Sequence, residues 1–558
     1  MTERRLLSWL ETATTDRGIQ FAGPDDAWSW WPYERLARLA RRAAWGLAER
    51  GVRAGDAVVL VQRSGPDFVA ALFGTMLAGA VPAVAAPPAS FQDPDQYGDH
   101  FARILRTARP ALVVTEADLA ARLDRLGAGA TGAPIAAFAD VVAALDEDQR
   151  TPDRPRADLA LLQFTSGSSG PARGVRVPFA ALEANVGAIR RWLRMGEGDA
   201  TASWLPVHHD LGLIGCLLTP IVDGGDLWLL RTGDFVRRPL RYLECFARRG
   251  ATLTAMPAFG IEHVVRRVRP GDLEGLDLSG WRAAIVGAER LDAAMLDRFH
   301  ELLAPHGLRR ETLLPAYGLA EATLAVTGLP VHEGWRALDV DPASLAVGRR
   351  LAPGHPGAPG ESVRLVGCGR PLAGTAVTVV DDAGSPLPDG HVGVVVVAGP
   401  QVAAGYVGEA GAESLTAFSG EVLWTGDAGA IVDGQLYVAG RLGDSTKVRA
   451  GTLFAEELEL LVAGRGVPSH RVAVALGSHR GVPTAVAVLE RPRAGWTELV
   501  RDLLRRRCET GEVFVVPVEA GGIARTSSGK PRRRHIWQAF VDGRLAALTT
   551  DDSNWRTA

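Results

Sequence analysis

The stretch Leu162-Gln-Phe-Thr-Ser-Gly-Ser-Ser-Gly170 places a run of hydroxyls and glycines directly after an apolar segment. We predict a strand that ends in a phosphate-binding loop, because such loops present backbone amides and hydroxyls to phosphate oxygens. The stretch is not a Walker motif, since the spacing and the Gly-Lys-Ser/Thr ending of that motif are missing. On its own this loop is a weak signal, because many Ser/Gly runs are flexible linkers.

Helical and strand patterns alternate on both sides of this loop. Residues 34–50 have helical periodicity, and the apolar run 57–62 that follows is typical of a buried strand. A similar helix–strand pair covers 65–86, and short apolar runs recur at 111–115 and 283–287. This alternation predicts a largely parallel α/β sheet.

The sequence pattern changes from about residue 363. Short β-rich runs separated by Asp-Gly and Gly-Pro turns predict a small antiparallel β subdomain. After Gly440-Arg-Leu-Gly443 a short tail follows, with helices expected near 455–463 and 496–507 and a strand near 471–477.

The expected fold class is therefore α/β with two unequal domains. We predict a large N-terminal domain at 1–440, built from two parallel α/β subdomains plus the small β subdomain. A small, mobile α+β C-terminal domain is expected at 441–558. The segment 328–362 lacks clear periodicity and is rich in Gly and Pro, so it is read either as a functional loop or as a variable surface insertion.

Composition narrows the class of protein. The chain has 558 residues, 47% of them hydrophobic and 22% charged, with a net charge of −3, as in ordinary soluble globular proteins. No basic excess points to nucleic acid, and four scattered cysteines have no metal-ligand spacing. The uncharged stretch 68–92 is broken by glycines and prolines, which argues against a membrane span. We expect a cytoplasmic protein; its oligomeric state is open.

Lysine is almost absent from the chain. Only Lys447 and Lys530 occur among 61 basic residues, and both lie within motifs. Lysine is a compact point charge, whereas arginine is a planar fork, so the two are not interchangeable where one oxygen must be reached through a narrow gap. We predict that each lysine serves one chemical stage.

Six further motifs follow the Ser/Gly loop in order. They are Ser203-Trp-Leu-Pro-Val-His-His-Asp-Leu-Gly-Leu-Ile-Gly215, Gly287-Ala-Glu289, Tyr317-Gly-Leu-Ala-Glu-Ala-Thr323, Trp424-Thr-Gly-Asp427, Gly440-Arg441 and Arg525-Thr-Ser-Ser-Gly-Lys530. Together they resemble the adenylate-forming superfamily of acyl-CoA synthetases, luciferases and adenylation domains. The stretches Arg336-Ala-Leu-Asp-Val-Asp341, Leu345-Ala-Val-Gly-Arg349 and Cys368-Gly-Arg-Pro-Leu372 look like the fatty acyl-AMP ligase branch.

This resemblance implies roles for individual residues. The cofactors would be ATP and Mg²⁺, with Glu321 as the metal ligand. Lys530 would bridge carboxylate and α-phosphate, His209 would lie over the acid, and Lys447 would serve the second step. The ATP contacts would come from Thr165, Ser166, Gly167, Ser168, Ser169 and Gly170 (phosphates), Gly287, Ala288 and Glu289 (purine and acyl pocket), Tyr317 and Gly318 (adenine), Thr323 (α-phosphate), and Asp427 and Arg441 (ribose).

The chain departs from the pattern of the superfamily at several positions. Arg173 stands where related enzymes commonly have lysine, and Gly443 stands at a hinge position that is usually Asp or Lys. Ala450 replaces a loop glycine. Lys447 occupies a position that is usually aliphatic in fatty acyl-AMP ligases but is lysine in luciferases and CoA ligases.

The function expected from the resemblance is activation of a carboxylic acid, most like a fatty acid, to acyl-AMP. The acyl group would then pass to a carrier-protein thiol, because in fatty acyl-AMP ligases the insertion at 328–362 hinders the closure needed for CoA. The alternatives are a CoA ligase, a biosynthetic ligase for a small or aromatic acid, and a nucleotide-binding protein without activity.

Overall fold

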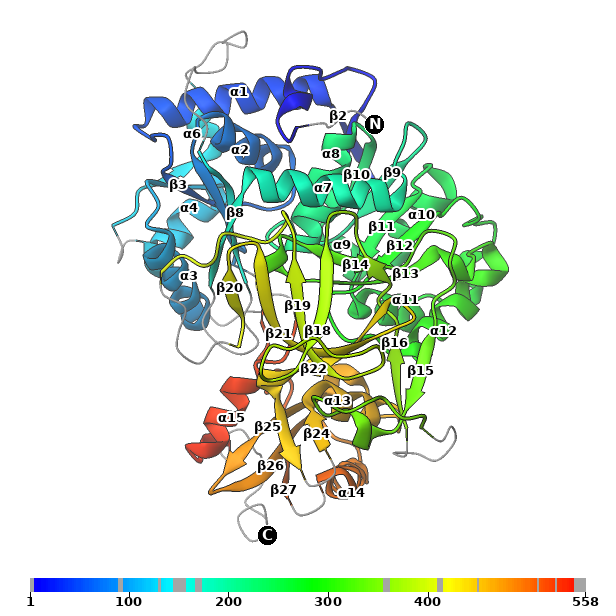
Figure 1. The fold of residues 1–558 in the computed structure, drawn as a ribbon. Helices are drawn as coiled ribbons and strands as arrows, with labels where there is room; N and C mark the ends of the chain where they lie inside the picture. The colour runs from blue at the N-terminus through cyan, green and yellow to red at the C-terminus, as the bar shows by residue number, and fades with distance from the viewer. Residues whose placement is uncertain are drawn as a thin grey trace.

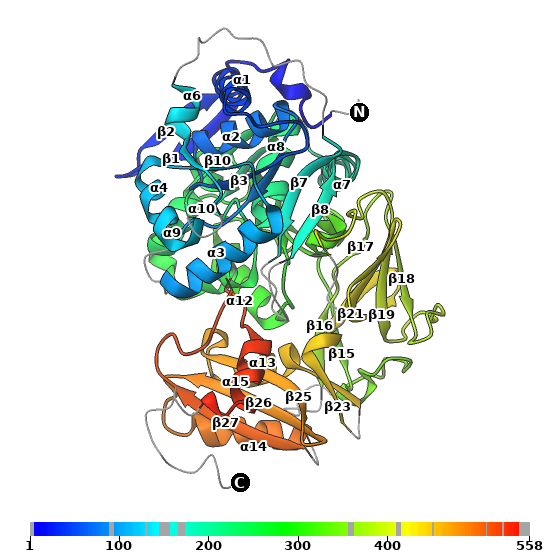
Figure 2. The ribbon, with the colours of Figure 1, turned by 90° about the vertical axis from the view of Figure 1, so that its left-hand side faces the viewer.

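The computed structural model describes residues 5–88, 94–128, 132–143, 157–165, 173–354, 362–408, 415–448, 451–508, 511–526 and 529–545. Figure 1 shows a large upper part that holds two sheets flanked by helices, with a smaller part beneath it. In Figure 2 the chain just before the last helix extends from the small part towards the large one.

The first parallel sheet has the strand order β6-β5-β3-β4-β7-β8. Its central strands are apolar throughout, because helices cover both faces of a parallel sheet. The last pair is antiparallel and carries the Ser/Gly loop between its strands. The strands are β3 (Ala57–Val61), β4 (Val81–Val84), β5 (Leu112–Thr115), β6 (Ile135–Ala137), β7 (Leu159–Phe164) and β8 (Gly174–Pro178).

The second sheet has the order β17-β14-β13-β12-β11-β9-β10-β1-β2. Strands β10, β9, β11, β12 and β13 run parallel, so their carboxyl ends lie at one edge, where open α/β sheets bind ligands. The strands are β1 (Gly18–Ala22), β2 (Trp28–Pro32), β9 (Ala200–Ser203), β10 (Asp226–Leu229), β11 (Leu253–Met256), β12 (Ala283–Val286), β13 (Leu313–Gly318), β14 (Ala325–Gly328) and β17 (Arg370–Pro371).

Helices surround these two sheets. The long helices α1, α7 and α12 each bury an apolar face against the core. The helices are α1 (Tyr33–Glu49), α2 (Pro66–Leu77), α3 (Pro94–Ala108), α4 (Ala117–Leu123), α6 (Phe138–Val142), α7 (Phe179–Leu193), α8 (Thr219–Asp223), α9 (Thr232–Arg237), α10 (Pro239–Arg248), α11 (Ala258–Arg267) and α12 (Ala293–Leu303). Within the described ranges, none is both long and apolar enough to cross a bilayer.

A third, antiparallel sheet forms the β subdomain expected after residue 363. It contains β18 (Ala376–Val380), β19 (Gly393–Ala398), β20 (Ala417–Ser419), β21 (Val422–Val432) and β22 (Gln435–Arg441). Strand β15 (Ala337–Val340) pairs with β16 (Val363–Val366) beside it. Val340 and Leu345 are buried in the same apolar cluster as Phe454. The described part of 328–362 is therefore packed into the protein and is not a loose surface insertion.

The small part is an α+β unit with apolar cores of its own. Strands β25 (Val472–His479), β26 (Val482–Glu490) and β27 (Glu512–Val518) carry α13 (Ala455–Ala463) and α14 (Trp496–Cys508) on one face and α15 (Arg533–Val541) on the other. The alternation of a strand explains this, since Val472 and Val474 face one core and Ala473 and Ala475 the other. A hairpin of β23 (Ser445–Val448) and β24 (Gly451–Phe454) follows β22.

Candidate active site

A cavity of about 1140 Å³ opens where the large part, the β subdomain and the small part meet. Its polar lining comes from the loops after β12 and β13, from β21 and β22, and from the chain before α15. An apolar lining continues back along β9, β11 and β12 towards the end of α7. One cavity thus combines a polar region with an apolar arm.

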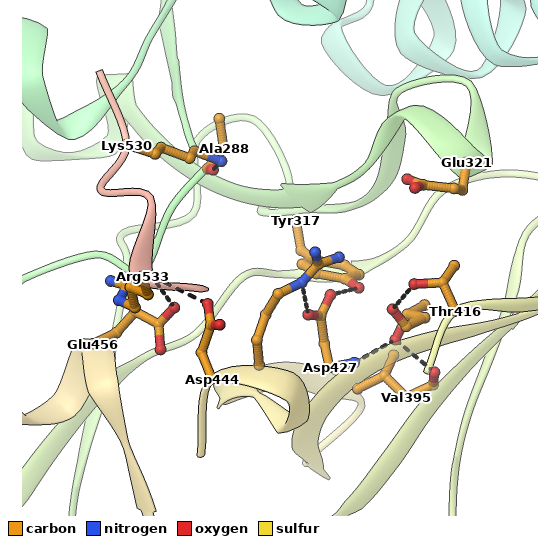
Figure 3. Close-up of polar contacts among 12 residues, drawn as sticks. Ala288, Tyr317, Glu321, Val395, Thr416, Asp427, Asp444, Glu456, Lys530 and Arg533 are labelled. Atoms are coloured by element: carbon orange, nitrogen blue, oxygen red, sulfur yellow. Dashed lines mark hydrogen bonds and ion pairs between the residues drawn. The ribbon is translucent and has the colours of Figure 1, made fainter. Parts of the chain in front are cut away.

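Lys530 enters this cavity from the small part. Its Nζ donates a hydrogen bond of 2.5 Å to the backbone carbonyl of Ala288, as Figure 3 shows. Ala288 has a φ of +72°, a conformation that non-glycine residues adopt at a cost and that clusters at functional sites. The residue before it, Gly287, must lack a side chain, since a Cβ there would lie 2.7 Å from the carbonyl oxygen of Ala316.

Tyr317, Asp427 and Arg441 form a hydrogen-bonded group that also lines the cavity. Figure 3 shows Tyr317 and Asp427 of this group. The hydroxyl of Tyr317 donates to Oδ2 of Asp427 at 2.6 Å, and Nε of Arg441 donates to Oδ1 at 2.9 Å. Burial and the neighbouring carboxylate raise the pKa of Tyr317, so the phenol remains a donor. Each carboxylate oxygen can accept more than one hydrogen bond, so Asp427 can also accept hydroxyl groups of a ligand.

Glu321 lies in the third polar region of the cavity. Its Oε1 accepts a hydrogen bond of 2.6 Å from the hydroxyl of Tyr406, and the guanidinium of Arg173 lies 5.1 Å from the centre of the Tyr406 ring. Glu321 is only 7% exposed but lines the cavity, as Thr165 does. One carboxylate on the wall of a polar cavity fits Mg²⁺, which is usually held by one or two carboxylates and by phosphate oxygens of the substrate.

Two adjacent histidines face the cavity after β9. The Nδ1 of His209 lies 2.7 Å from Oδ1 of Asp210, a contact that fixes the orientation of the imidazole. Burial by itself raises the pKa of Asp210, but His209 and the Leu211 amide outweigh it and leave that pKa below its ordinary value. Burial, together with the neighbouring His209, lowers the pKa of His208 to about 4, so His208 is neutral near pH 7.

The apolar arm of the cavity has a fixed end. Trp192, Leu193 and Met195 line it at the carboxyl end of α7. Nε1 of Trp192 donates to the carbonyl of Leu329 at 2.7 Å, which holds the indole in place. Behind Leu193, Arg282 donates to its carbonyl at 2.7 Å, and Arg282 is itself ion-paired with Asp199 at 2.6 Å. The arm therefore has a wall of apolar side chains here, held from behind by the Arg282–Asp199 pair.

The structure brings most of the predicted site residues to this cavity. Those that line it are Thr165, His209, Gly287, Ala288, Glu289, Tyr317, Gly318, Glu321, Asp427, Arg441 and Lys530. At Gly318 a Cβ would lie 1.9 Å from the carbonyl oxygen of Leu324, which explains the glycine. Ser166, Gly167, Ser168, Ser169 and Gly170 lie outside the described residues.

Two predicted residues lie elsewhere. Thr323 is fully buried, its hydroxyl donates to the carbonyl of Gln401 at 2.7 Å, and it does not line the cavity. Its φ of +67° turns the chain two residues after Glu321. Lys447 is exposed on β23 and does not line the cavity.

Some residues of the site could not be found from the sequence. Tyr406 is 85 positions from the carboxylate that it contacts, so no local spacing connects them. Asp210 belongs to the His-His-Asp motif, but the sequence alone does not show its contact with His209. Arg533, Asp444 and the glutamates of α13 line the lower cavity wall and carried no motif signal beyond the Lys530 run.

The fold and the cavity define an adenylate-forming enzyme, and comparison with known proteins agrees. The chain belongs to the AMP-binding enzyme family, whose sequence model matches residues 11–407. It is 34% identical to a putative acyl-CoA synthetase of Caulobacter vibrioides over 92% of this chain and 90% of that protein. It is 31% identical to the medium-chain-fatty-acid–acyl-carrier-protein ligase JamA of Moorena producens, with 92% and 90% covered.

A solved structure also covers nearly the whole chain. It comes from a study of fatty acyl-adenylate ligases from E. coli and L. pneumophila and superimposes with a TM-score of 0.87 at 27% identity. The match covers 97% of this chain and 99% of that one. The α/β fold with its small C-terminal unit is therefore confirmed.

Proposed function

We propose that the protein joins a fatty acid to AMP and then passes the acyl group to the thiol of a carrier protein. In the first step a carboxylate oxygen of the acid attacks the α-phosphorus of ATP, and pyrophosphate leaves. In the second step the thiol attacks the acyl carbon, AMP leaves, and a thioester forms. The observation that carries this proposal is the position of Lys530, whose ammonium lies where the polar region of the cavity meets its apolar arm.

The polar region suits ATP. Asp427 and Arg441 would hold the ribose, and Tyr317 would pack against the adenine, with Gly287, Ala288 and Glu289 along the purine edge. Glu321 would hold Mg²⁺, which supplies charge neutralisation on the phosphates. Lys530 would neutralise the charge that develops between carboxylate and α-phosphate, a preorganised contribution in a cavity shielded from water.

The apolar arm supports a fatty acid rather than a small polar acid. Leu253 begins β11 beside Ala283, and Gly287 follows β12 four residues beyond Ala283, so the lining spans about 13 Å along the parallel strands at roughly 3.3 Å per residue. A small acid would leave this apolar volume unfilled. His209, held by Asp210, would lie near the carboxylate end of the acid.

The choice of carrier protein over CoA rests on two supports. JamA, by its name, is an acyl-carrier-protein ligase, although the Caulobacter relative bears an acyl-CoA synthetase name. The segment around Val340 and Leu345 also packs against Phe454 of the small part, a contact that would hinder rotation of that part. We therefore propose that 441–558 is a domain that can rotate but whose rotation is restrained by this contact. Lys447 would serve the second step.

Pyrophosphate release separates the possible functions. The purified protein is incubated with ATP, Mg²⁺ and acids that range from acetate and benzoate to long-chain fatty acids. Release that depends on fatty acids, followed by thioester formation on a phosphopantetheinylated carrier protein but not on CoA, is the expected result. Equal or greater turnover with benzoate or acetate, or efficient formation of acyl-CoA, would contradict the proposal. No acid-dependent release at all would leave only nucleotide binding.

A further inference from the structure

Arg533 is the most highly connected cation of the small domain among the described residues. It is the first residue of α15, three positions after Lys530, and it is only 7% exposed. Its Nε and Nη2 donate to the two carboxylate oxygens of Glu459 at 3.2 and 2.7 Å, and its Nη1 donates to Glu456 at 3.1 Å. The same Nη1 lies 3.3 Å from Oδ2 of Asp444, as Figure 3 shows.

These contacts connect three separate segments of the chain. Glu456 and Glu459 lie on α13, whereas Asp444 ends the short turn that leaves β22 directly after Arg441. Arg441 is ion-paired with Asp427 in the proposed nucleotide site. Asp427 is thus linked to Arg441 by an ion pair, Arg441 to Asp444 by the short turn between them, and Asp444 to Arg533 by a second ion pair.

The described residues on the two sides of the turn that leads into Lys530, called here the Lys530 loop, are hydrogen-bonded to one another. The amide of Thr526 donates to the carbonyl of Lys530 at 2.8 Å, and the amide of Lys530 donates to the Thr526 hydroxyl at 3.1 Å. Nη1 of Arg525 donates to the carbonyl of Gly529 at 2.8 Å. The amide of Arg532 also donates to the carbonyl of Ala524 at 2.8 Å. Because Arg533 follows Lys530 by only three residues and these bonds hold both ends of the segment, a displacement of Arg533 would carry the backbone of Lys530 with it.

We propose that Arg533 is a positioning residue for Lys530: its contacts with Asp444, Glu456 and Glu459 hold the Lys530 loop so that the ammonium reaches Ala288. This inference rests on the proposed function, in which Lys530 serves the first step. Two features of the cluster support a positioning role rather than a contribution to stability. A buried ion pair usually stabilises a protein no more than well-packed apolar side chains in its place would. The planar guanidinium of arginine, bonded through two nitrogens, also fixes the carboxylate of Glu459 in one geometry.

The cluster also brings several charges together in a buried place. Three carboxylates surround one guanidinium, with Arg441 facing Asp444, Arg290 facing Glu456 and Arg525 facing Glu459 from neighbouring segments. Burial and Glu456 raise the pKa of Asp444 to about 6, although Arg533 and Arg441 oppose this. Such an arrangement costs free energy, which is expected of a group of residues that serves a function.

A double-mutant cycle tests the proposal. Arg533→Met is expected to lower the rate of acid-dependent pyrophosphate release about 10²-fold, as a misplacement of about 1 Å can do, with the KM for ATP little changed. In the Lys530→Ala background the same substitution should cause no further loss, because Arg533 acts through Lys530. Multiplicative losses in the double variant would overturn the proposal. Arg533→Lys should rescue poorly, since an ammonium lacks the fork.

Arg507→Met is the matched control. Arg507 on α14 is ion-paired with Glu457 on α13, so it is another ion-paired, partly buried arginine of the same domain, but its pair does not include the Lys530 loop. It should keep wild-type pyrophosphate release. A loss equal to that of Arg533→Met would show that the effect is general to the domain. If Arg533→Met does not fold, Glu459→Gln, which removes the bidentate partner, is tested in the same cycle.

Hydrogen exchange gives a readout that does not depend on the proposed activity. The amides of Thr526, Lys530 and Arg532 are hydrogen-bonded within the loop and should exchange faster in Arg533→Met but not in Arg507→Met. Unchanged exchange at these amides would contradict the positioning role. If exchange rises as expected but the wild type releases no pyrophosphate with any acid, the proposed function is wrong, whereas the conclusion that Arg533 positions the Lys530 loop is retained.

Discussion

The Nζ of Lys530 donates to the carbonyl of Ala288 at 2.5 Å, although 242 positions separate the two residues in the chain. This contact joins the small domain to the loop after β12, at the carboxyl edge of the second sheet. The same orientation leaves Lys447 exposed on β23, outside the cavity. The structure therefore has the arrangement expected for the first chemical step and not for the second.

Thr323 is expected to affect stability and not catalysis. Thr323→Ala removes the only described side-chain donor to the buried carbonyl of Gln401, which should lower the free energy of unfolding by about 1–3 kcal/mol. The KM for ATP should stay unchanged, because the side chain does not line the cavity. Denaturant unfolding and pyrophosphate-release kinetics measure the two effects. A raised KM for ATP without any loss of stability would contradict this prediction and indicate that Thr323 contacts the phosphates of ATP.

Leu345 is expected to restrain the small domain. It is fully buried beside Phe454, so Leu345→Ala should cost about 2–5 kcal/mol and loosen this contact. If the contact hinders rotation, the variant should form acyl-CoA faster than the wild type. Leu303→Ala is the control, since Leu303 is equally buried but lies in the core of the large domain. The same gain in both variants, or none in Leu345→Ala, would refute the restraint.

Lys447 is expected to serve only the transfer step. Lys447→Ala should release pyrophosphate at the normal rate, because this side chain lies outside the cavity in the present orientation. Transfer from a preformed acyl-adenylate to carrier protein should slow, since conformational steps commonly divide a catalytic cycle. A single-turnover assay follows the decay of the adenylate, with the exposed Arg480→Ala as control. Equal decay in all three proteins would make Lys447 incidental.

Stability is expected to fall as the pH drops from about 6.5 towards 4. The pKa of His208 and that of His100 are both lowered to about 4, chiefly by burial. In this window the unfolded chain binds protons that the folded protein does not, so each group can contribute up to about 1.4 kcal/mol per pH unit. His208→Gln should flatten the pH dependence of the free energy of unfolding. An unchanged slope would show that His208 titrates normally.

Local patterns predicted much of the fold. Helix α13 at Ala455–Ala463 matches its expected span, and strands β3 and β12 begin at the expected residues, because apolar periodicity reflects burial. The segment 328–362 was harder to interpret. Its β15 strand is only four residues long, and its buried residues are irregularly spaced, so they produce no period.

The residues of a motif that line the cavity could be predicted from the sequence. The residues that are connected only by contacts with one another could not. Asp427, Tyr317 and Lys530 each belong to a motif and lie in one cavity. The contacts of Arg533 with Asp444 and Glu459 depend on tertiary packing, and nothing in the sequence spacing of these residues links them. Thr323 shows that a residue within a motif can bond the backbone, here the carbonyl of Gln401.

The central claim is that Lys530 supplies charge at the point where acid and ATP react. The direct measurement is single-turnover formation of fatty acyl-AMP, with ATP, Mg²⁺ and a saturating fatty acid, in the wild type, Lys530→Ala and Lys530→Arg. We predict that the wild type accumulates acyl-AMP and that Lys530→Ala forms it about 10²–10³-fold more slowly while still binding ATP. Lys530→Arg should also be slow. Acyl-AMP formation at the wild-type rate in Lys530→Ala would contradict the account.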